Sequence, residues 1–421
     1  MISLAELSPA ERLLVKLAQR REIRAPLDGE DMLLEERTFR ERFTRLAMSH
    51  GVHGLVLSAI VRAPLKQSLS AKVLEEFTVW FAHLRRQAIM WDMERDRLLS
   101  LLERKGLIPV VLKGGALRET IYDQPAERSL GDLDLLFPDE QVESSIATLQ
   151  ANGYSLPSDE VREAYRQHHF HFLLTHPVGF AVEVHWALSR PNEDFHLDSR
   201  AFLARAVERP RVSGPLLRVP SAEDMILHMA SQNVEDAFAR LRRVVDVDRI
   251  IASTPHLDWN YLRQAARHGE VQILTAVALR LAHLLLGTPV PRGFVESLGV
   301  SRLTRLNLAL FRAVPWMITM HDDRRESAAT LLCLWTTVGW RKRLRRCSMI
   351  ALMREDPLDW VWQGRGEPDG RKGRLRGFAS LAKLAAYQAW IYVSGIAALL
   401  TRSGRRGVRF WTEPRAPSDL L

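Results

Sequence analysis

Two short motifs constrain this chain more than any other feature. They are Leu112-Lys113-Gly114-Gly115 and, further on, Gly131-Asp132-Leu133-Asp134-Leu135-Leu136. Alternate side chains of a strand leave the same face about 7 Å apart, so Asp132 and Asp134 are expected to share a pocket. Carboxylates held that close require a cation, and oxygen ligands of this kind suit Mg²⁺ and the clamping of a phosphoryl group. Replacing Asp134 by Asn should then relieve like-charge repulsion in the metal-free protein.

The Gly-Gly pair lies between an apolar run, Leu107–Leu112, and Ala116–Thr120, which reads as the start of a helix. A flexible turn that opens a helix presents free backbone N–H groups that suit a phosphate. Gly114 and Gly115 are therefore predicted to bind a nucleotide. Lys113 is expected to neutralise triphosphate charge, although a Lys that closes a strand is as often simply solvated.

A third carboxylate, Glu183, lies in the apolar run Phe180–Trp186. An ionised Glu in a buried strand is costly unless it is paired or bound to a metal, so its placement favours a functional role. His185 shares a strand face with Glu183 and is predicted to orient that carboxylate or to contact substrate. Arg128 has a planar guanidinium group whose geometry matches a β- or γ-phosphate, so it is a predicted phosphate contact. The structural alternative is a salt bridge between Arg128 and a neighbouring carboxylate.

These motifs resemble, in their order, the uncharacterised branch of the nucleotidyltransferases that share the DNA polymerase β catalytic fold. The matching features are Lys113-Gly114-Gly115, Tyr122, Pro125, Arg128, Asp132-Leu133-Asp134 and Val182–Trp186. The resemblance implies an acidic pair on one strand and a third carboxylate, Glu183, on a later strand. Gly115 departs from the pattern, because many relatives place Ser there and its hydroxyl contact is not available.

The resemblance extends loosely to a downstream helical pattern that contains Leu241–Asp246. It implies a nucleotide contact by Arg242. Arg242 and Asp246 are also four residues apart on the expected helix, where such a pair is usually structural.

The expected fold class is α+β, with a polymerase β-type core of a small mixed sheet and helices, flanked by N-terminal and C-terminal helical regions. The chain is expected to divide into an N-terminal helical cap (residues 1–85), a catalytic domain (86–215), a helical domain (216–330) and a basic C-terminal region with an apolar helix (331–421). Strands are predicted at 107–112, 130–137, near 169–174 and at 178–186, and helices at 89–104, 116–122 and 139–151.

A cluster of three histidines, His168, His169 and His171, precedes the last of these strands. It lacks a cysteine and a regular second His spacing, so a zinc site is not predicted there.

The positive charge of the chain is unevenly distributed. Residues 331–421 carry 17 Lys and Arg against 7 Asp and Glu, whereas the first 330 residues carry 42 against 43. Residues 378–400 are mostly apolar, but Lys383 and Gln388 interrupt them, which favours a packed or membrane-surface helix over a span. The C-terminal region is therefore expected to contact RNA or an anionic membrane. Two cysteines and the lack of a signal-like N-terminus indicate a cytoplasmic protein, or one peripheral at the membrane.

The predicted activity is the Mg²⁺-dependent transfer of a nucleoside monophosphate from an NTP to a hydroxyl or phosphate of an acceptor, with a small molecule or protein favoured. Asp132 and Asp134 are expected to hold two metal ions, with Mn²⁺ as an alternative ion. Glu183 is expected to hold the metal that activates the acceptor oxygen and to accept its proton. The competing hypotheses are a toxin-like nucleotidyltransferase that modifies tRNA and a nucleotide-binding regulatory protein without turnover.

Overall fold

The structure is a computed structural model. It describes residues 7–20, 27–62, 67–156, 159–191, 193–209, 214–233, 238, 240–302, 304–305, 334–344, 385 and 389. The described residues separate into two compact units. The helical unit is drawn from Met1–Val52 and Met229–Arg354, and the sheet unit is drawn from His53–His228.

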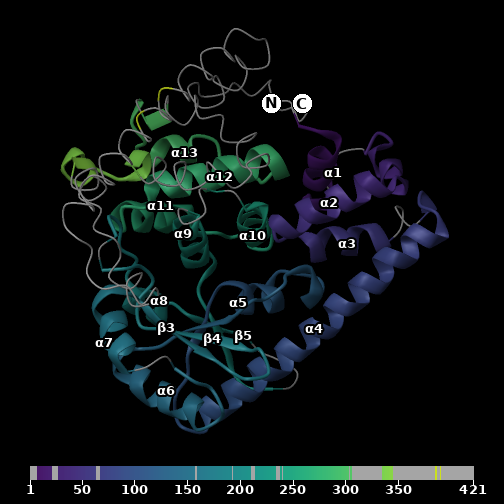
Figure 1. Cartoon of the computed structure of the whole chain (residues 1–421). Coiled ribbons are helices and arrows are strands. Elements are labelled where there is room, and N and C mark those ends of the chain that lie inside the picture. Colours follow the sequence, from purple (N-terminus) through teal and green to yellow (C-terminus); the bar gives the residue numbers. More distant parts are fainter. Residues whose placement is uncertain are drawn as a thin grey trace. The chain divides into compact units, whose positions relative to one another are not determined.

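The sheet unit combines six strands with helices that pack on them (Figure 1). Its elements are α3 (His53–Val61), α4 (Ala71–Glu103), β1 (Val110–Val111), α5 (Lys113–Thr120), the 3₁₀ helices η5 (Pro125–Glu127) and η6 (Asp139–Gln141), β2 (Leu133–Leu136), α6 (Val142–Gln150), α7 (Asp159–His168), β3 (His171–Thr175), β4 (Ala181–His185), α8 (Ser199–Ala204), β5 (Val207–Arg209) and β6 (Leu217–Val219). Helix α9 (Ala222–Gln232) begins in this unit. The mixed α+β class and the strands predicted near residues 110, 134, 172 and 183 are confirmed.

The strand order is β3-β4-β2-β1-β6-β5, so neighbours in the sheet are not neighbours in the chain. Strand β2 pairs in parallel with β4 and antiparallel with β1, and β1 pairs in parallel with β6. The β3–β4 and β5–β6 pairs are antiparallel. The short strand β6 lies inside the region that the sequence assigned to a helical domain, because a three-residue strand leaves too little alternation to recognise.

Alternation places the apolar residues of the central strands on one face of the sheet. The residues that alternate with the acidic positions are buried: Leu133, Leu135, Val182 and Val184 are each 0% exposed. Helix α6 packs against β4, and α4 packs against α6. The other face of β2 and β4 is therefore left to carry the polar side chains.

Helix α4 continues without a break from Ala71 to Glu103, through the boundary expected at residue 85 (Figure 1). Ser70 caps its N-terminus, with Oγ accepting a hydrogen bond from the Val73 amide at 3.5 Å. Phe77, Phe81 and Leu84 recur every three or four residues and are buried, which gives the helix one continuous apolar stripe. The boundary at residue 85 therefore falls inside one element.

Two buried arginines tie α4 to α5. Arg118 of α5 donates to the carbonyl oxygen of Ala88 at 2.9 Å and contacts Asp92 at 3.3 Å. Arg95 of α4 reaches back to Glu119 at 2.9 Å. Guanidinium groups buried in this way need several partners, so the contacts fix the position of α5 on α4. Since α5 begins at the Lys-Gly-Gly motif, this anchoring also positions that motif.

The helical unit contains the N-terminal helices and a second group from the later part of the chain. Its elements are α1 (Pro9–Ala18), the 3₁₀ helix η3 (Glu30–Glu35), α2 (Arg37–Ser49), α10 (Leu241–Ala252), α11 (Trp259–His268), α12 (Gln272–Leu286) and α13 (Phe294–Ser297). Buried Asp248 of α10 joins these segments, because it accepts from Thr288 at 2.7 Å and pairs with Arg20 at 3.2 Å.

Gly54 is required by close packing between α3 and η5. A Cβ atom there would overlap the backbone carbonyl oxygen of Ala126 and lie 3.3 Å from the Cα of Glu127. We expect Gly54→Ala to lower the free energy of unfolding by about 2 kcal/mol, because overpacking outweighs the gain of about 1 kcal/mol in helix propensity. Urea denaturation measures this change. Gly131→Ala is the matched control, since a Cβ there meets no atom within 4 Å. Equal losses in the two variants would contradict the packing explanation.

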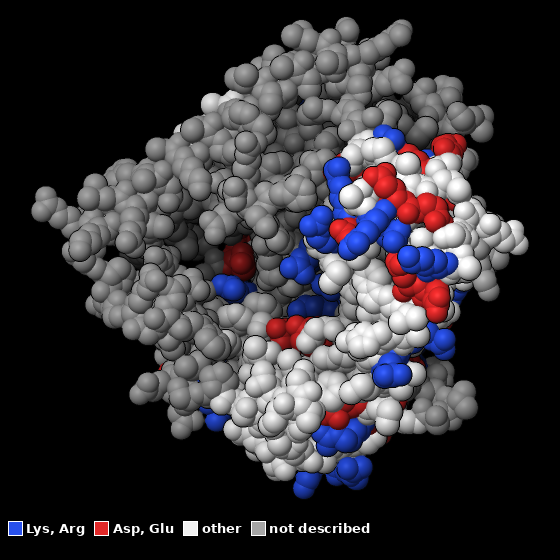
Figure 2. Space-filling view, turned by 45° about the vertical axis from the view of Figure 1, so that its right-hand side comes forward, with Lys and Arg blue, Asp and Glu red and all other residues white. Residues whose placement is uncertain are grey.

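The expected apolar helix at residues 378–400 lies outside the described residues, apart from Ala385 and Ala389. Within the part of the chain that the structure describes, no helix has the length and apolar character needed to cross a bilayer. Figure 2 shows acidic and basic side chains of the described residues interspersed on the face it presents. This mixture agrees with the near balance of charge in the first 330 residues.

Candidate active site

Strand register brings Asp134 and Glu183 side by side. The two residues are direct partners in the parallel β2–β4 pair, so their side chains leave the same face of the sheet. His185 lies two residues beyond Glu183 and shares that face, and the antiparallel β3–β4 pair places His171 opposite His185. Four polar side chains from three strands thus gather on one face.

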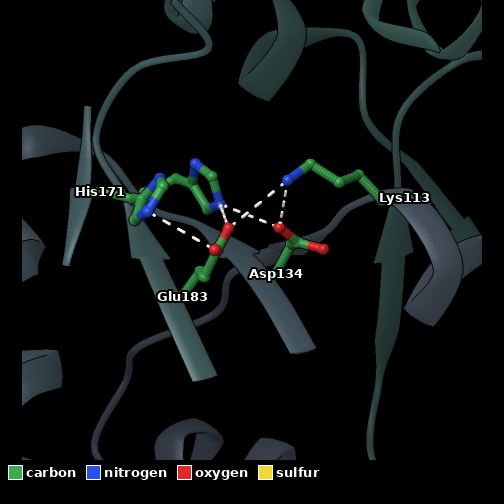
Figure 3. Close-up of polar contacts among 5 residues, drawn as sticks. Lys113, Asp134, His171 and Glu183 are labelled. Atoms are coloured by element: carbon green, nitrogen blue, oxygen red, sulfur yellow. Dashed lines mark hydrogen bonds and ion pairs between the residues drawn. The ribbon is translucent and has the colours of Figure 1, made fainter. Parts of the chain in front are cut away.

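The ammonium group of Lys113 joins the two carboxylates (Figure 3). Its Nζ lies 2.6 Å from Asp134 Oδ1 and 3.4 Å from Glu183 Oε2. Asp134 is buried, and the Lys113 side chain is 21% exposed. The alternative of a merely solvated Lys113 does not hold, because its ammonium group pairs with both carboxylates, and its contact with a triphosphate stays a prediction.

The two imidazoles complete the cluster. His185 Nε2 lies 3.1 Å from both Asp134 Oδ1 and Glu183 Oε2, and His171 Nε2 lies 3.5 Å from Glu183 Oε1. Within the described residues, the Nδ1 atom of neither ring has a hydrogen-bond partner. The orientation of each ring is therefore set by the carboxylates that its Nε2 atom contacts. This arrangement of His185 fits the orienting role expected from the sequence.

Burial and charge act in opposite directions on Lys113 and Asp134. Burial disfavours the charge of Lys113, but the Asp134 and Glu183 carboxylates outweigh it and raise the pKa of the ammonium group. Burial likewise disfavours the Asp134 carboxylate, but Lys113 and a hydrogen bond from His185 hold the pKa of Asp134 well below its usual value. Both groups are therefore charged at neutral pH.

The two histidines shift in opposite directions. Burial opposes protonation of His185, yet its hydrogen bonds to Asp134 and Glu183 raise its pKa. Burial and the neighbouring His185 and His169 lower the pKa of His171 well below its usual value. The pair therefore combines one imidazole whose surroundings favour the protonated form with one whose surroundings favour the neutral form.

Helix α5 begins at Lys113, so Gly114 and Gly115 lie in its first turn and not in a flexible loop before it. Their lack of side chains allows close packing: a Cβ on Gly114 would lie 2.5 Å from Leu130 Cδ2, and one on Gly115 would lie 2.9 Å from Leu133 Cδ1. Lys113 has a φ of +43°, a conformation that residues with side chains rarely adopt and that recurs at functional sites. The first N–H groups of a helix have no partner within it, so a helix start of this kind suits an anion.

Arg128 lies beside the helix start. A Cβ on Gly114 would be 3.1 Å from Arg128 Nη1, and the same nitrogen donates to the carbonyl oxygen of Ser129 at 2.9 Å. The adjacent Glu127 accepts from Ser58 at 2.6 Å. The structure therefore brings together two of the predicted phosphate contacts, the Gly114 backbone and the Arg128 guanidinium.

Asp132 and Arg242 stand apart from the central cluster in different ways. Asp132 immediately precedes β2 and is half-buried, and its charge contributes to the raised pKa of Lys113, which places it near that ammonium group. Arg242 belongs to the helical unit, in the first turn of α10, where its side chain lies beside Gly51. Its nucleotide contact stays a prediction.

His171 was not among the residues selected from the sequence. Its neighbours His168 and His169 suggested an irregular cluster, whereas only His171 enters β3 and pairs with His185. The β3–β4 hairpin could have identified His171 as a site residue. The short turn between Thr175 and Ala181 sets the register of the two strands, and this register places His171 opposite His185.

Carboxylates paired on neighbouring strands, beside the N-terminus of a glycine-containing helix, are typical of enzymes that act on phosphate groups. Residues 38–287, more than half of the 421 residues, match the sequence profile of a family described as uncharacterised nucleotidyltransferase. The chain therefore belongs to this family of nucleotidyltransferases. A search of curated proteins and a search of solved structures each gave no significant match.

The raised pKa of His185 predicts a pH-dependent contribution to stability. The contribution of a group whose pKa is higher in the folded state than its unfolded value of 6.5 is complete below that value, and it is lost as pH rises through the folded pKa. In EDTA, the difference in free energy of unfolding between wild type and His185→Gln should therefore shrink from about pH 6.5 upward.

Urea denaturation across that pH range measures the difference. His196→Gln is the control for loss of an imidazole, because His196 is exposed and lies outside the cluster. A difference that grows with pH in the His185 variant would contradict the predicted direction.

Proposed function

We propose that the chain transfers a nucleoside monophosphate from an NTP to a hydroxyl or phosphate of an acceptor, using a polymerase β-type nucleotidyltransferase core. The observation that carries the proposal is the convergence of Asp134 and Glu183 on one cationic group. Lys113 Nζ contacts the first at 2.6 Å and the second at 3.4 Å, beside the N-terminus of α5. Membership of the nucleotidyltransferase family supports the same reaction class.

The acidic residues fit a divalent cation. A positive charge already lies between Asp134 and Glu183, and Asp132 is close enough to influence that charge. Carboxylate oxygens suit Mg²⁺, with Mn²⁺ as an alternative. Asp132, Asp134 and Glu183 would hold two ions, which supply charge neutralisation on the triphosphate and activation of the acceptor oxygen.

The start of α5 and Arg128 would position the triphosphate. The N–H groups of Gly114 and Gly115 belong to the first helical turn, where backbone donors and the helix dipole favour an anion. Arg128 lies next to Gly114 and offers a planar fork to a phosphate oxygen. The ammonium group of Lys113 would move from the Asp134–Glu183 pair to contact the same phosphates. His185 would hold the two carboxylates in place.

In the proposed transfer, an acceptor oxygen forms a bond to the α-phosphorus of the NTP as the bond to the β-phosphate oxygen breaks. Pyrophosphate leaves with that electron pair, and Glu183 accepts the proton of the acceptor. Most of the rate comes from positioning and charge neutralisation, because phosphoryl chemistry needs little covalent work from the protein.

The favoured acceptor is a small molecule or a protein. The second candidate is a tRNA, as in toxin-like nucleotidyltransferases, and it is favoured by the 17 Lys and Arg against 7 Asp and Glu of residues 331–421. We propose that this basic region makes any contact with RNA or with an anionic membrane. Such contact should weaken steeply with added salt.

The test is mass spectrometry after incubation of the full chain with each NTP, Mg²⁺ and separate pools of small molecules, proteins and tRNA. A mass gain of one nucleotide with wild type, but not with Asp134→Asn, supports the transfer and identifies donor and acceptor class. A gain on tRNA selects the second candidate. NTP binding without product in any pool would contradict transfer and favour a nucleotide-binding regulatory protein.

A further inference from the structure

Each oxygen of the Glu183 carboxylate contacts an imidazole, and Oε2 contacts Lys113 as well. Figure 3 shows His171 and Lys113 approaching the Glu183 carboxylate from opposite sides. His171 Nε2 is 3.5 Å from Glu183 Oε1, and His185 Nε2 is 3.1 Å from Glu183 Oε2. The ligand-type atoms of the three residues lie within 4.8 Å of one another. The Glu183 carboxylate therefore faces two different environments.

The spacing and type of these atoms fit a metal ion. Two ligands of a tetrahedral zinc ion are separated by about 3.3 Å, which follows from metal–ligand bonds of about 2.0–2.1 Å. The two nitrogen–oxygen distances, 3.5 Å and 3.1 Å, lie close to this value. Imidazole nitrogens suit first-row transition metals, whereas Mg²⁺ prefers a shell of oxygen ligands.

The surroundings hold the three ligands in place. All three project from the paired strands β3 and β4, with His171 directly opposite His185 in the register. His185 is fully buried, and the side chains of His171 and Glu183 are 13% and 14% exposed. Side chains fixed on adjacent strands lose little conformational freedom on binding, so the site is largely formed in advance.

We propose that His171, Glu183 and His185 bind one first-row transition-metal cation, with Zn²⁺ as the reference ion. Three protein ligands leave a coordination position open, as in catalytic zinc sites, and the Asp134 carboxylate lies beside them, 3.1 Å from His185 Nε2. The site shares Glu183 with the proposed nucleotidyl-transfer site but draws its selectivity from the two imidazoles. Cation binding there goes beyond the proposed transfer and does not require it.

The test uses the full chain after treatment with EDTA. Isothermal titration calorimetry measures the affinity for Zn²⁺ and for Mg²⁺, and the visible absorption of bound Co²⁺ reports nitrogen ligation. His171→Ala should lower the Zn²⁺ affinity by at least about 10-fold while changing the Mg²⁺ affinity by less than about 2-fold. His196→Ala is the matched control, since it removes an exposed imidazole of the same unit.

Three results would overturn the proposal: no Zn²⁺ binding by wild type, a Zn²⁺ affinity that His171→Ala leaves unchanged, or equal losses for Zn²⁺ and Mg²⁺. Equal losses would make His171 a positioning residue of Glu183. If His171→Ala does not fold, X-ray absorption of the Zn²⁺-loaded wild type provides the test, because it counts the imidazole ligands without a variant. Two imidazole ligands support the proposal, and fewer than two contradict it.

The outcome is distinguishable from that of the proposed transfer. Zn²⁺ binding that depends on His171, in a chain that transfers no nucleotide, would support this site and contradict the transfer. Nucleotide transfer with Mg²⁺, together with Zn²⁺ binding that does not depend on His171, would support the transfer and contradict this site.

Discussion

Asp134→Asn is expected to lower the rate of nucleotide transfer by about a hundredfold to a thousandfold. Asp134 lies at the centre of the acidic cluster, with Lys113 Nζ at 2.6 Å and His185 Nε2 at 3.1 Å from the same oxygen. An amide cannot supply the negative charge that holds a cation, and loss of one group that stabilises transition-state charge costs about 10²–10³-fold. Steady-state kinetics with the identified acceptor measures this loss.

The same variant is expected to be less stable than wild type without metal, by about 1–3 kcal/mol. Considered alone, the Asp-x-Asp spacing predicts relief of repulsion, but the structure shows that Asp134 is paired with a cation. Among the described residues, the substitution leaves Lys113 paired with Glu183, at 3.4 Å. Asp139→Asn is the control, because Asp139 is 70% exposed and pairs with Arg166 at the surface. Full activity in Asp134→Asn would remove Asp134 from the site.

Lys113→Met is expected to have the largest effect on stability in the absence of metal. It leaves buried Asp134 without its closest cation, and breaking a buried pair in this way costs about 3 kcal/mol. Saturating Mg²⁺ or Mn²⁺ should recover much of the loss, because a bound cation then neutralises the carboxylates. NTP affinity should remain weaker than in wild type, since the ammonium group is also proposed to contact phosphate.

Urea denaturation in EDTA and in excess divalent cation measures the first two effects, and calorimetric titration with NTP measures the third. Lys105→Met is the matched control, because Lys105 is exposed and follows α4 on the same unit. Equal stability of the Lys113 variant and wild type in EDTA would contradict the role of Lys113 as counter-ion. A loss that divalent cations leave unchanged would contradict the exchange of ammonium for metal.

The tertiary structure also changes how the Lys-Gly-Gly motif is understood. Its glycines resemble a flexible phosphate-binding turn in the sequence, whereas in the structure they allow α5 to approach Leu130 and Leu133. Close packing and anion binding are compatible here, because both use a helix start without side chains. The position of that start depends on Arg95 and Arg118, which the sequence did not mark as partners.

Local pattern in the sequence was sufficient to locate the central strands and their acidic residues. The apolar residues that alternate with Asp134 and Glu183 indicate buried strands, and a carboxylate in such a strand indicates a partner or a metal. The helix at residues 139–151 was equally accessible, since η6 and α6 together cover residues 139–150. These strands and helices depend on residues that are close together in the sequence, so local pattern was enough to predict them.

Only the tertiary structure decided which charged groups meet. Asp134 and Glu183 face one another because β2 and β4 are paired in one register, although 49 residues separate them in a sequence whose strand order is rearranged in the sheet. Lys113 enters as their counter-ion, and His171 reaches Glu183 through the β3–β4 hairpin. The sequence thus specified the chemical groups of the site, and strand pairing over long separations determined their distances, because register is a property of two strands together.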